Sequence, residues 1–145
     1  HIAGLETAIA LLEAEGLPNV WARHQRLAGA VHAAVERWAV PGAMRFHARL
    51  PETRSASVTA IEVAPGIDPE ALRTVARERF QVAMAGGLGP LAGRVFRIGH
   101  LGDMNEPMIL GALAGIEAAM TVQKIPFGTD GVAAAVAFLA AQSTR

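Results

Sequence analysis

The amino-acid sequence predicts an α+β fold, in which a small, mostly antiparallel sheet has helices packed on one face. Helix-forming segments flank a central region in which apolar and polar residues alternate. The expected elements follow no strict β-α-β order, and the sequence shows no internal repeat. The chain has 145 residues, 52% of them apolar and 18% charged, which is enough to bury a core.

The first part of the chain is expected to form two helices. Residues 3–15 are rich in Ala, Leu and Glu and end at Gly16, and a longer helix is expected over 19–38. Apolar positions in the longer segment step by three and four, as one stripe of a helix does. This stripe consists of Val20, His24, Leu27, Val31, Val35 and Trp38.

The middle of the chain is expected to form strands. Residues 44–50 and 57–63 alternate apolar and polar side chains, as half-buried strands do. Asp68 and Pro69 are typical of a helix start, and that helix is expected to run to about residue 79. A short strand is expected over 80–84, then a glycine-dense loop over 85–93 and another strand over 95–99.

Two helices are expected to close the chain. Asp103 or Asn105 can cap the first of them, and Thr129 or Asp130 can start the second, which runs to about residue 141. The expected order is helix, helix, strand, strand, helix, strand, strand, helix, helix.

Composition argues against several classes of protein. Lys plus Arg and Asp plus Glu number 13 each, so the net charge is zero, and the absence of a basic run argues against a nucleic-acid partner. The chain has no cysteine, which excludes disulfides and thiolate chemistry. No apolar run is long enough to span a membrane, and residues 1–5 do not resemble a signal peptide. We therefore expect a cytoplasmic location and part of a longer polypeptide.

Arg97 is the strongest candidate for ligand binding. It stands between Phe96 and Ile98 in an apolar strand that follows the glycine-dense loop. An arginine there could simply face solvent, or its guanidinium could bind a carboxylate in bidentate fashion. The loop itself is either a tight hairpin or backbone that a ligand approaches closely, and it lacks the ending of a nucleotide P-loop.

Other polar residues are weaker candidates for a functional role. No histidine pair has metal-ligand spacing with a third ligand nearby, so no metal site is expected. His100 directly follows the Arg97 strand and is a candidate to border a cleft and act through a neighbouring residue. Lys124 is the single lysine; its place at a helix end favours a structural cation over a Schiff base. Ser55 and Ser57 lack the partners of a hydrolase nucleophile.

Residues 88–106, and above all the run from Phe96 to Asp103, resemble the C-terminal signature of class V pyridoxal-phosphate aminotransferases. The similarity is greatest to the serine–glyoxylate and alanine–glyoxylate enzymes. Residues 15–28 resemble the long interdomain helix of that family, and 110–117 and 131–135 resemble its closing helices.

The resemblance implies a fold-type I homodimer in which this chain is the C-terminal small domain. Residues 1–40 would link to a large domain outside this chain, and residues 41–145 would form the small domain. Arg97 would bind the substrate α-carboxylate, and Gly86, Gly87, Leu88 and Gly89 would line the active-site mouth.

The resemblance also implies that pyridoxal 5′-phosphate is bound mainly by the large domain, whose cofactor lysine has no counterpart here. The implied reaction transfers an amino group from serine or alanine to glyoxylate, and the isolated chain would be inactive. Two alternatives stay open. One is a non-catalytic carboxylate-binding or dimerisation module, and the other is a related aminotransferase that uses an aminophosphonate.

Overall fold

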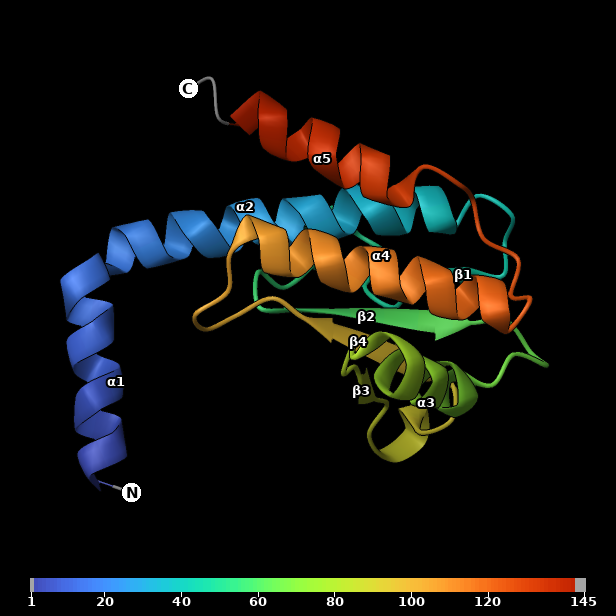
Figure 1. The fold of residues 1–145 in the computed structure, drawn as a ribbon, viewed down its shortest axis with the longest axis horizontal. Coiled ribbons are helices and arrows are strands. Elements are labelled where there is room, and N and C mark those ends of the chain that lie inside the picture. Colours follow the sequence, from blue (N-terminus) through green and yellow to red (C-terminus); the bar gives the residue numbers. More distant parts are fainter. Residues whose placement is uncertain (1, 143–145) are drawn as a thin grey trace.

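The computed structural model describes residues 2–142, which form five α-helices and a four-stranded sheet (Figure 1). His1 and residues 143–145, which the predicted domains include, lie outside the described part. The helices are α1 (Ile2–Glu15), α2 (Leu17–Trp38), α3 (Pro69–Phe80), α4 (Glu106–Val122) and α5 (Gly131–Gln142). The strands are β1 (Met44–Phe46), β2 (Val58–Val63), β3 (Ala85–Gly86) and β4 (Val95–Gly99), with 3₁₀ turns at Pro51–Thr53 and Gly89–Leu91.

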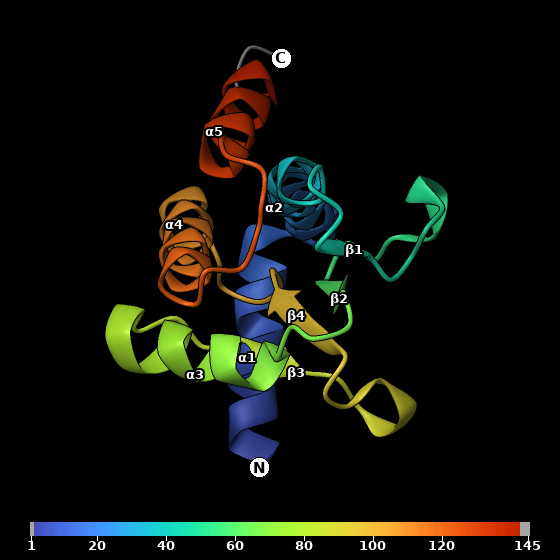
Figure 2. The same cartoon turned by 90° about the vertical axis from the view of Figure 1, so that its right-hand side faces the viewer.

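The sheet has the strand order β1-β2-β4-β3, and every neighbouring pair is antiparallel. Figure 2 shows α2, α3 and α4 on the same side of the strands. The predicted α+β class, with an antiparallel sheet and helices on one face, is confirmed. The order of helices and strands also agrees, except that the strand predicted over 80–84 is replaced by one at residues 85 and 86.

One core lies between the sheet and these helices. Alternate strand residues point into it and are buried, including Phe46, Ile61, Phe96 and Ile98. The predicted stripe of α2 faces the same core, and its five apolar members are buried. Helix α5 covers α2 and α4 from outside, and Gly29 of α2 leaves room for the Phe138 ring of α5.

A buried polar contact joins three helices at one end of this core. The indole Nε1 of Trp38 donates to Glu117 Oε1 at 2.8 Å, and the backbone N–H of Val132 donates to the same oxygen at 3.0 Å. Trp38 belongs to α2, Glu117 to α4, and Val132 to the first turn of α5. The carboxylate therefore stabilises the positive end of α5 and satisfies the fully buried indole.

Helix α1 projects away from this core (Figure 1). It has no buried residue, and apolar side chains such as Ile2, Leu5 and Leu11 are exposed. Helix α2, in contrast, belongs to the same core as the sheet. The predicted domain boundary after residue 40 stays a prediction.

The predicted strand over 44–50 is shorter than expected. The chain leaves the ladder after His47, whose N–H still donates to Ala60 O at 2.9 Å. Pro51 then begins a 3₁₀ turn. Because proline has no N–H, the alternating pattern cannot continue as a paired strand through this point.

The predicted strand over 80–84 is wrong. Phe80 is the last residue of α3, and Gln81 takes a left-handed conformation with φ 58°. The N–H of Val82 then donates to Ala76 O at 3.0 Å, which closes the helix end. Strand β3 follows at residues 85 and 86, inside the segment that the sequence predicted as loop.

Candidate substrate-carboxylate site

Arg97 lies at the centre of β4, on the face of the sheet turned away from the helices. Its strand neighbours Phe96 and Ile98 are buried in the core, so the alternation of a strand directs Arg97 to the opposite face. It pairs with Ala60 of β2 on one side and Ala85 of β3 on the other. Both neighbours on this face are alanines, whose side chains are short.

A backbone carbonyl fixes the direction of the Arg97 side chain. Arg97 Nε donates to Gly86 O at 2.8 Å, and the side chain is half-buried. Within residues 2–142, Nη1 and Nη2 of Arg97 have neither a hydrogen-bond acceptor nor a carboxylate partner. The two terminal nitrogens are therefore free to bind both oxygens of a carboxylate.

The glycine-dense loop includes Gly86, whose carbonyl accepts the hydrogen bond from Arg97. After Gly86, the N–H of Gly87 donates to Val95 O at 2.9 Å, and the chain then turns back on itself. A Cβ on Gly87 would lie 1.9 Å from the carbonyl oxygen of Leu91, so only glycine fits there. Gly89 has φ +53° and Leu88 is 69% exposed. Of the four predicted mouth residues, Gly86 contacts Arg97, and the other three continue the loop from it.

His100 lies on the other side of the sheet from the Arg97 guanidinium. It is fully buried; its Nδ1 is 3.0 Å from Ala56 O and its Nε2 is 2.9 Å from Thr59 Oγ1. Since a carbonyl only accepts, Nδ1 carries the proton and the Thr59 hydroxyl donates to Nε2. Burial lowers the pKa of His100 and favours this neutral form. Its predicted action on the site stays a prediction, and the contacts found are structural ones.

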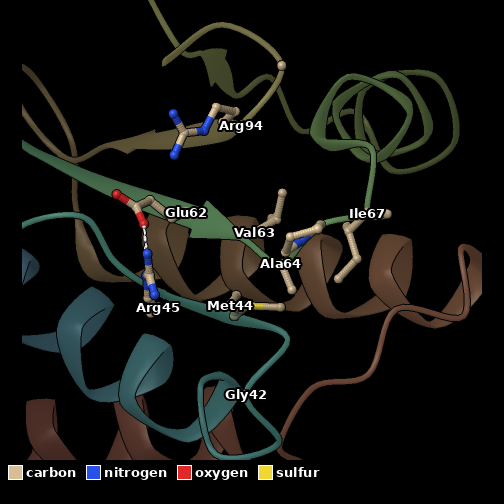
Figure 3. Close-up of a pocket in the computed structure, with 11 residues that line it drawn as sticks. Gly42, Met44, Arg45, Glu62, Val63, Ala64, Ile67 and Arg94 are labelled. Atoms are coloured by element: carbon tan, nitrogen blue, oxygen red, sulfur yellow. Dashed lines mark hydrogen bonds and ion pairs between the residues drawn. The ribbon is translucent and has the colours of Figure 1, made fainter. Parts of the chain in front are cut away.

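A second polar hollow, of about 530 Å³, lies between β1, the end of β2 and the segment before β4 (Figure 3). Arg45 and Glu62 form an ion pair there, at 2.7 Å between Nη2 and Oε2. His47 Nδ1 lies 2.7 Å from the other oxygen, and these contacts lower the pKa of Glu62. Glu62 thus neutralises Arg45 at this hollow, and Arg94 also lines it. None of the predicted site residues lines it.

The described residues do not provide the attachment point for pyridoxal phosphate. Lys124 is exposed just after the end of α4 with φ 54°, and it is the single lysine of the sequence. A Schiff-base lysine needs a desolvated pocket, which this position lacks. Within residues 2–142 no cluster of three or more His, Asp or Glu side chains is placed to hold a metal ion. No helix in that range has both the length and the apolar character to cross a bilayer.

Comparison with known proteins shows the relatives of this chain. No family model matches it. It is 46% identical to serine–glyoxylate aminotransferase of Hyphomicrobium methylovorum over 119 residues, which are 82% of this chain and 28% of that protein. It is 42% identical to L-aspartate–glyoxylate aminotransferase of Paracoccus denitrificans over 92% of this chain and 33% of that protein.

A solved structure confirms the fold. Pyridoxamine–pyruvate aminotransferase from Mesorhizobium loti superposes with a TM-score of 0.87 at 33% identity, over 96% of this chain and 35% of that one. The fold is thus that of the C-terminal domain of aminotransferases. The chain belongs to the class V aminotransferase family and corresponds to the C-terminal part of its members. It spans about a third of the length of the curated relatives it matches.

Proposed function

We propose that this chain is the small domain of a pyridoxal-phosphate-dependent aminotransferase that transfers an amino group from serine or alanine to glyoxylate. Arg97 binds the substrate α-carboxylate. The observation that carries the proposal is the Arg97 guanidinium, which Gly86 O holds at 2.8 Å while both terminal nitrogens lack a partner among residues 2–142. The similarity to aminotransferases that are named for glyoxylate supports the substrate class.

Arg97 serves both half-reactions because the amino donor and glyoxylate each present a carboxylate. A guanidinium is a positively charged fork of donors, so the site suits anionic substrates. A charge-assisted pair of this kind contributes about 1.5–3 kcal/mol, and it also fixes the orientation of the α-carbon. The cofactor, when bound, supplies the electron sink that stabilises the α-carbanion.

The remaining parts of the site must come from outside this chain. Lys124 is exposed at a helix end, so we propose that a longer polypeptide, assembled as a homodimer, supplies the cofactor lysine and phosphate ligands. Apolar side chains of α1 are exposed, among them Leu5 at 61% and Leu11 at 65% of their surface. This exposure supports another domain or subunit that packs against α1.

The test uses the full-length protein that carries this chain. Arg97→Lys and Arg97→Ala should raise KM for serine, alanine and glyoxylate by about 10-fold or more, because a bidentate pair is lost. Arg94→Lys is the matched control, since Arg94 is exposed and lies three residues before Arg97. Kinetics of the Arg97 variants that stay within twofold of the parent protein would refute the carboxylate role.

A non-catalytic carboxylate-binding module is the second candidate, because the chain contains no lysine in a pocket. An activity assay of the same full-length protein distinguishes the enzyme from the binding module. Conversion of serine and glyoxylate into hydroxypyruvate and glycine supports the enzyme. Binding of glyoxylate without turnover, in protein loaded with pyridoxal phosphate, supports the module.

A further inference from the structure

The carbonyl that orients Arg97 belongs to a very short edge strand. Strand β3 contains only Ala85 and Gly86 and has a strand partner, β4, on one side. Two-residue pairing alone holds a backbone weakly, because few ladder hydrogen bonds are made. The position of Gly86 O therefore depends on what else holds β3.

Arg73 of α3 provides that second attachment. Its Nε donates to Met84 O, one residue before β3, at 2.9 Å. Its Nη1 forms an ion pair with Glu70, one turn earlier in the same helix. Glu70 lies in the first turn of α3, which the Asp68 side chain caps by accepting from the N–H of Glu70 and of Ala71. The helix start, the ion pair and the strand thus form one connected unit.

The same pair packs directly against Gly86. A Cβ at Gly86 would lie 2.7 Å from Arg73 Nη1 and 2.8 Å from Glu70 Oε1. The ion pair occupies the space that a side chain at Gly86 would take, so a larger residue there would displace the ends of these two side chains. Gly86 is therefore held from α3 on one face, while its carbonyl holds Arg97.

We infer that Arg73, held by Glu70, is a positioning residue for substrate binding. It fixes the backbone at Met84 and Gly86, and through Gly86 O it sets the direction in which the Arg97 guanidinium faces the substrate. The inference rests on the proposed function of Arg97. A displacement of about 1 Å in a binding group can cost up to about 100-fold, so a loosened β3 should be measurable in substrate binding.

The experiment compares variants of the full-length protein loaded with pyridoxal phosphate. Arg73→Met keeps the apolar stem and removes both contacts, and it should raise KM for serine and glyoxylate by about 5- to 20-fold with a smaller effect on kcat. Arg73→Lys should recover part of this loss. Arg77→Met is the matched control, because Arg77 lies one turn later on α3, is exposed, and pairs only with its neighbour Glu78 in the described part of the chain.

A double-variant cycle separates positioning from a general structural effect. If Arg73 acts through Arg97, then Arg73→Met should add less than twofold to KM in an Arg97→Ala background. Independent multiplication of the two effects would overturn the inference, and so would an unchanged KM for Arg73→Met alone. Near-normal KM for Arg97→Ala would instead overturn the proposed function itself.

A milder substitution keeps the test available if Arg73→Met does not fold. Glu70→Gln removes the ion pair and leaves the Arg73 side chain in place. It should raise KM for the same substrates by about 2- to 5-fold, again without effect in the Arg97→Ala background. A KM for Glu70→Gln that equals the parent value would count against the inference.

Discussion

Replacement of Glu117 by alanine should destabilise the fold strongly. One carboxylate oxygen accepts from Trp38 Nε1 at 2.8 Å and from the N–H of Val132 at 3.0 Å, so the substitution removes two hydrogen bonds to a charged group. Trp38 is fully buried, and its indole N–H would lose its partner.

The magnitude follows from these two losses. An unpaired buried donor costs about 1–3 kcal/mol, and water can reach part of the space that Glu117 leaves at the start of α5. We therefore expect the free energy of unfolding to fall by about 2–4 kcal/mol for Glu117→Ala. Glu117→Gln keeps a carbonyl acceptor and loses the charge at the helix end, so its cost should be about 0.5–1.5 kcal/mol.

Urea denaturation followed by tryptophan fluorescence measures both variants, since the buried Trp38 becomes exposed on unfolding. Glu13→Ala is the control because Glu13 is exposed on α1, and its effect should stay within about 0.5 kcal/mol. Equal losses for the Ala and Gln variants would refute the hydrogen-bond argument. So would a loss below about 0.5 kcal/mol for Glu117→Ala.

Three further outcomes follow from local geometry. Burial lowers the pKa of His32 to about 4. The unfolded chain therefore binds a proton first, and stability should fall as pH drops from about 6.5 to about 4. His32→Phe should reduce the slope of a urea-midpoint profile in this range, to which the buried His100 contributes as well. Gly111→Ala should stabilise α4 by about 0.5–1 kcal/mol, because nothing lies within 4 Å of the new Cβ. Gly115→Ala should destabilise the same helix, because its Cβ would lie 2.5 Å from Val82 Cγ2. Thermal melts of the two variants should therefore shift in opposite directions. Asp68→Ala removes the side-chain cap of α3 and should cost about 1 kcal/mol in urea denaturation, where an unchanged midpoint would contradict the cap.

Local sequence patterns predicted those elements whose signals are local. Asp68 caps α3 as predicted, and Asn105, one of the two predicted candidates, caps α4, because a capping side chain needs only the residues that follow it. The strand over 95–99 has its predicted bounds, since Val95, Phe96 and Ile98 are all buried. The sequence also singled out Arg97, because a charge inside an apolar strand is visible without any tertiary information.

The remaining features depend on contacts that local patterns do not contain. Gln81 ends α3 in a left-handed conformation, a position that glycine usually occupies. Because this residue is not glycine, the sequence did not mark the helix end. The Glu70–Arg73 spacing predicts an ion pair but not its contact with Gly86. His100 is three residues from Arg97, and alternation along an extended chain already places residues at that spacing on opposite faces. That signal was available in the sequence.

Strand β4 divides two tasks between its two faces. Phe96 and Ile98 anchor the interior, while Arg97, Ala60 and Ala85 border the space where a ligand would lie. Substitutions at Ala60 and Ala85 can therefore change the surroundings of the guanidinium without repacking the interior.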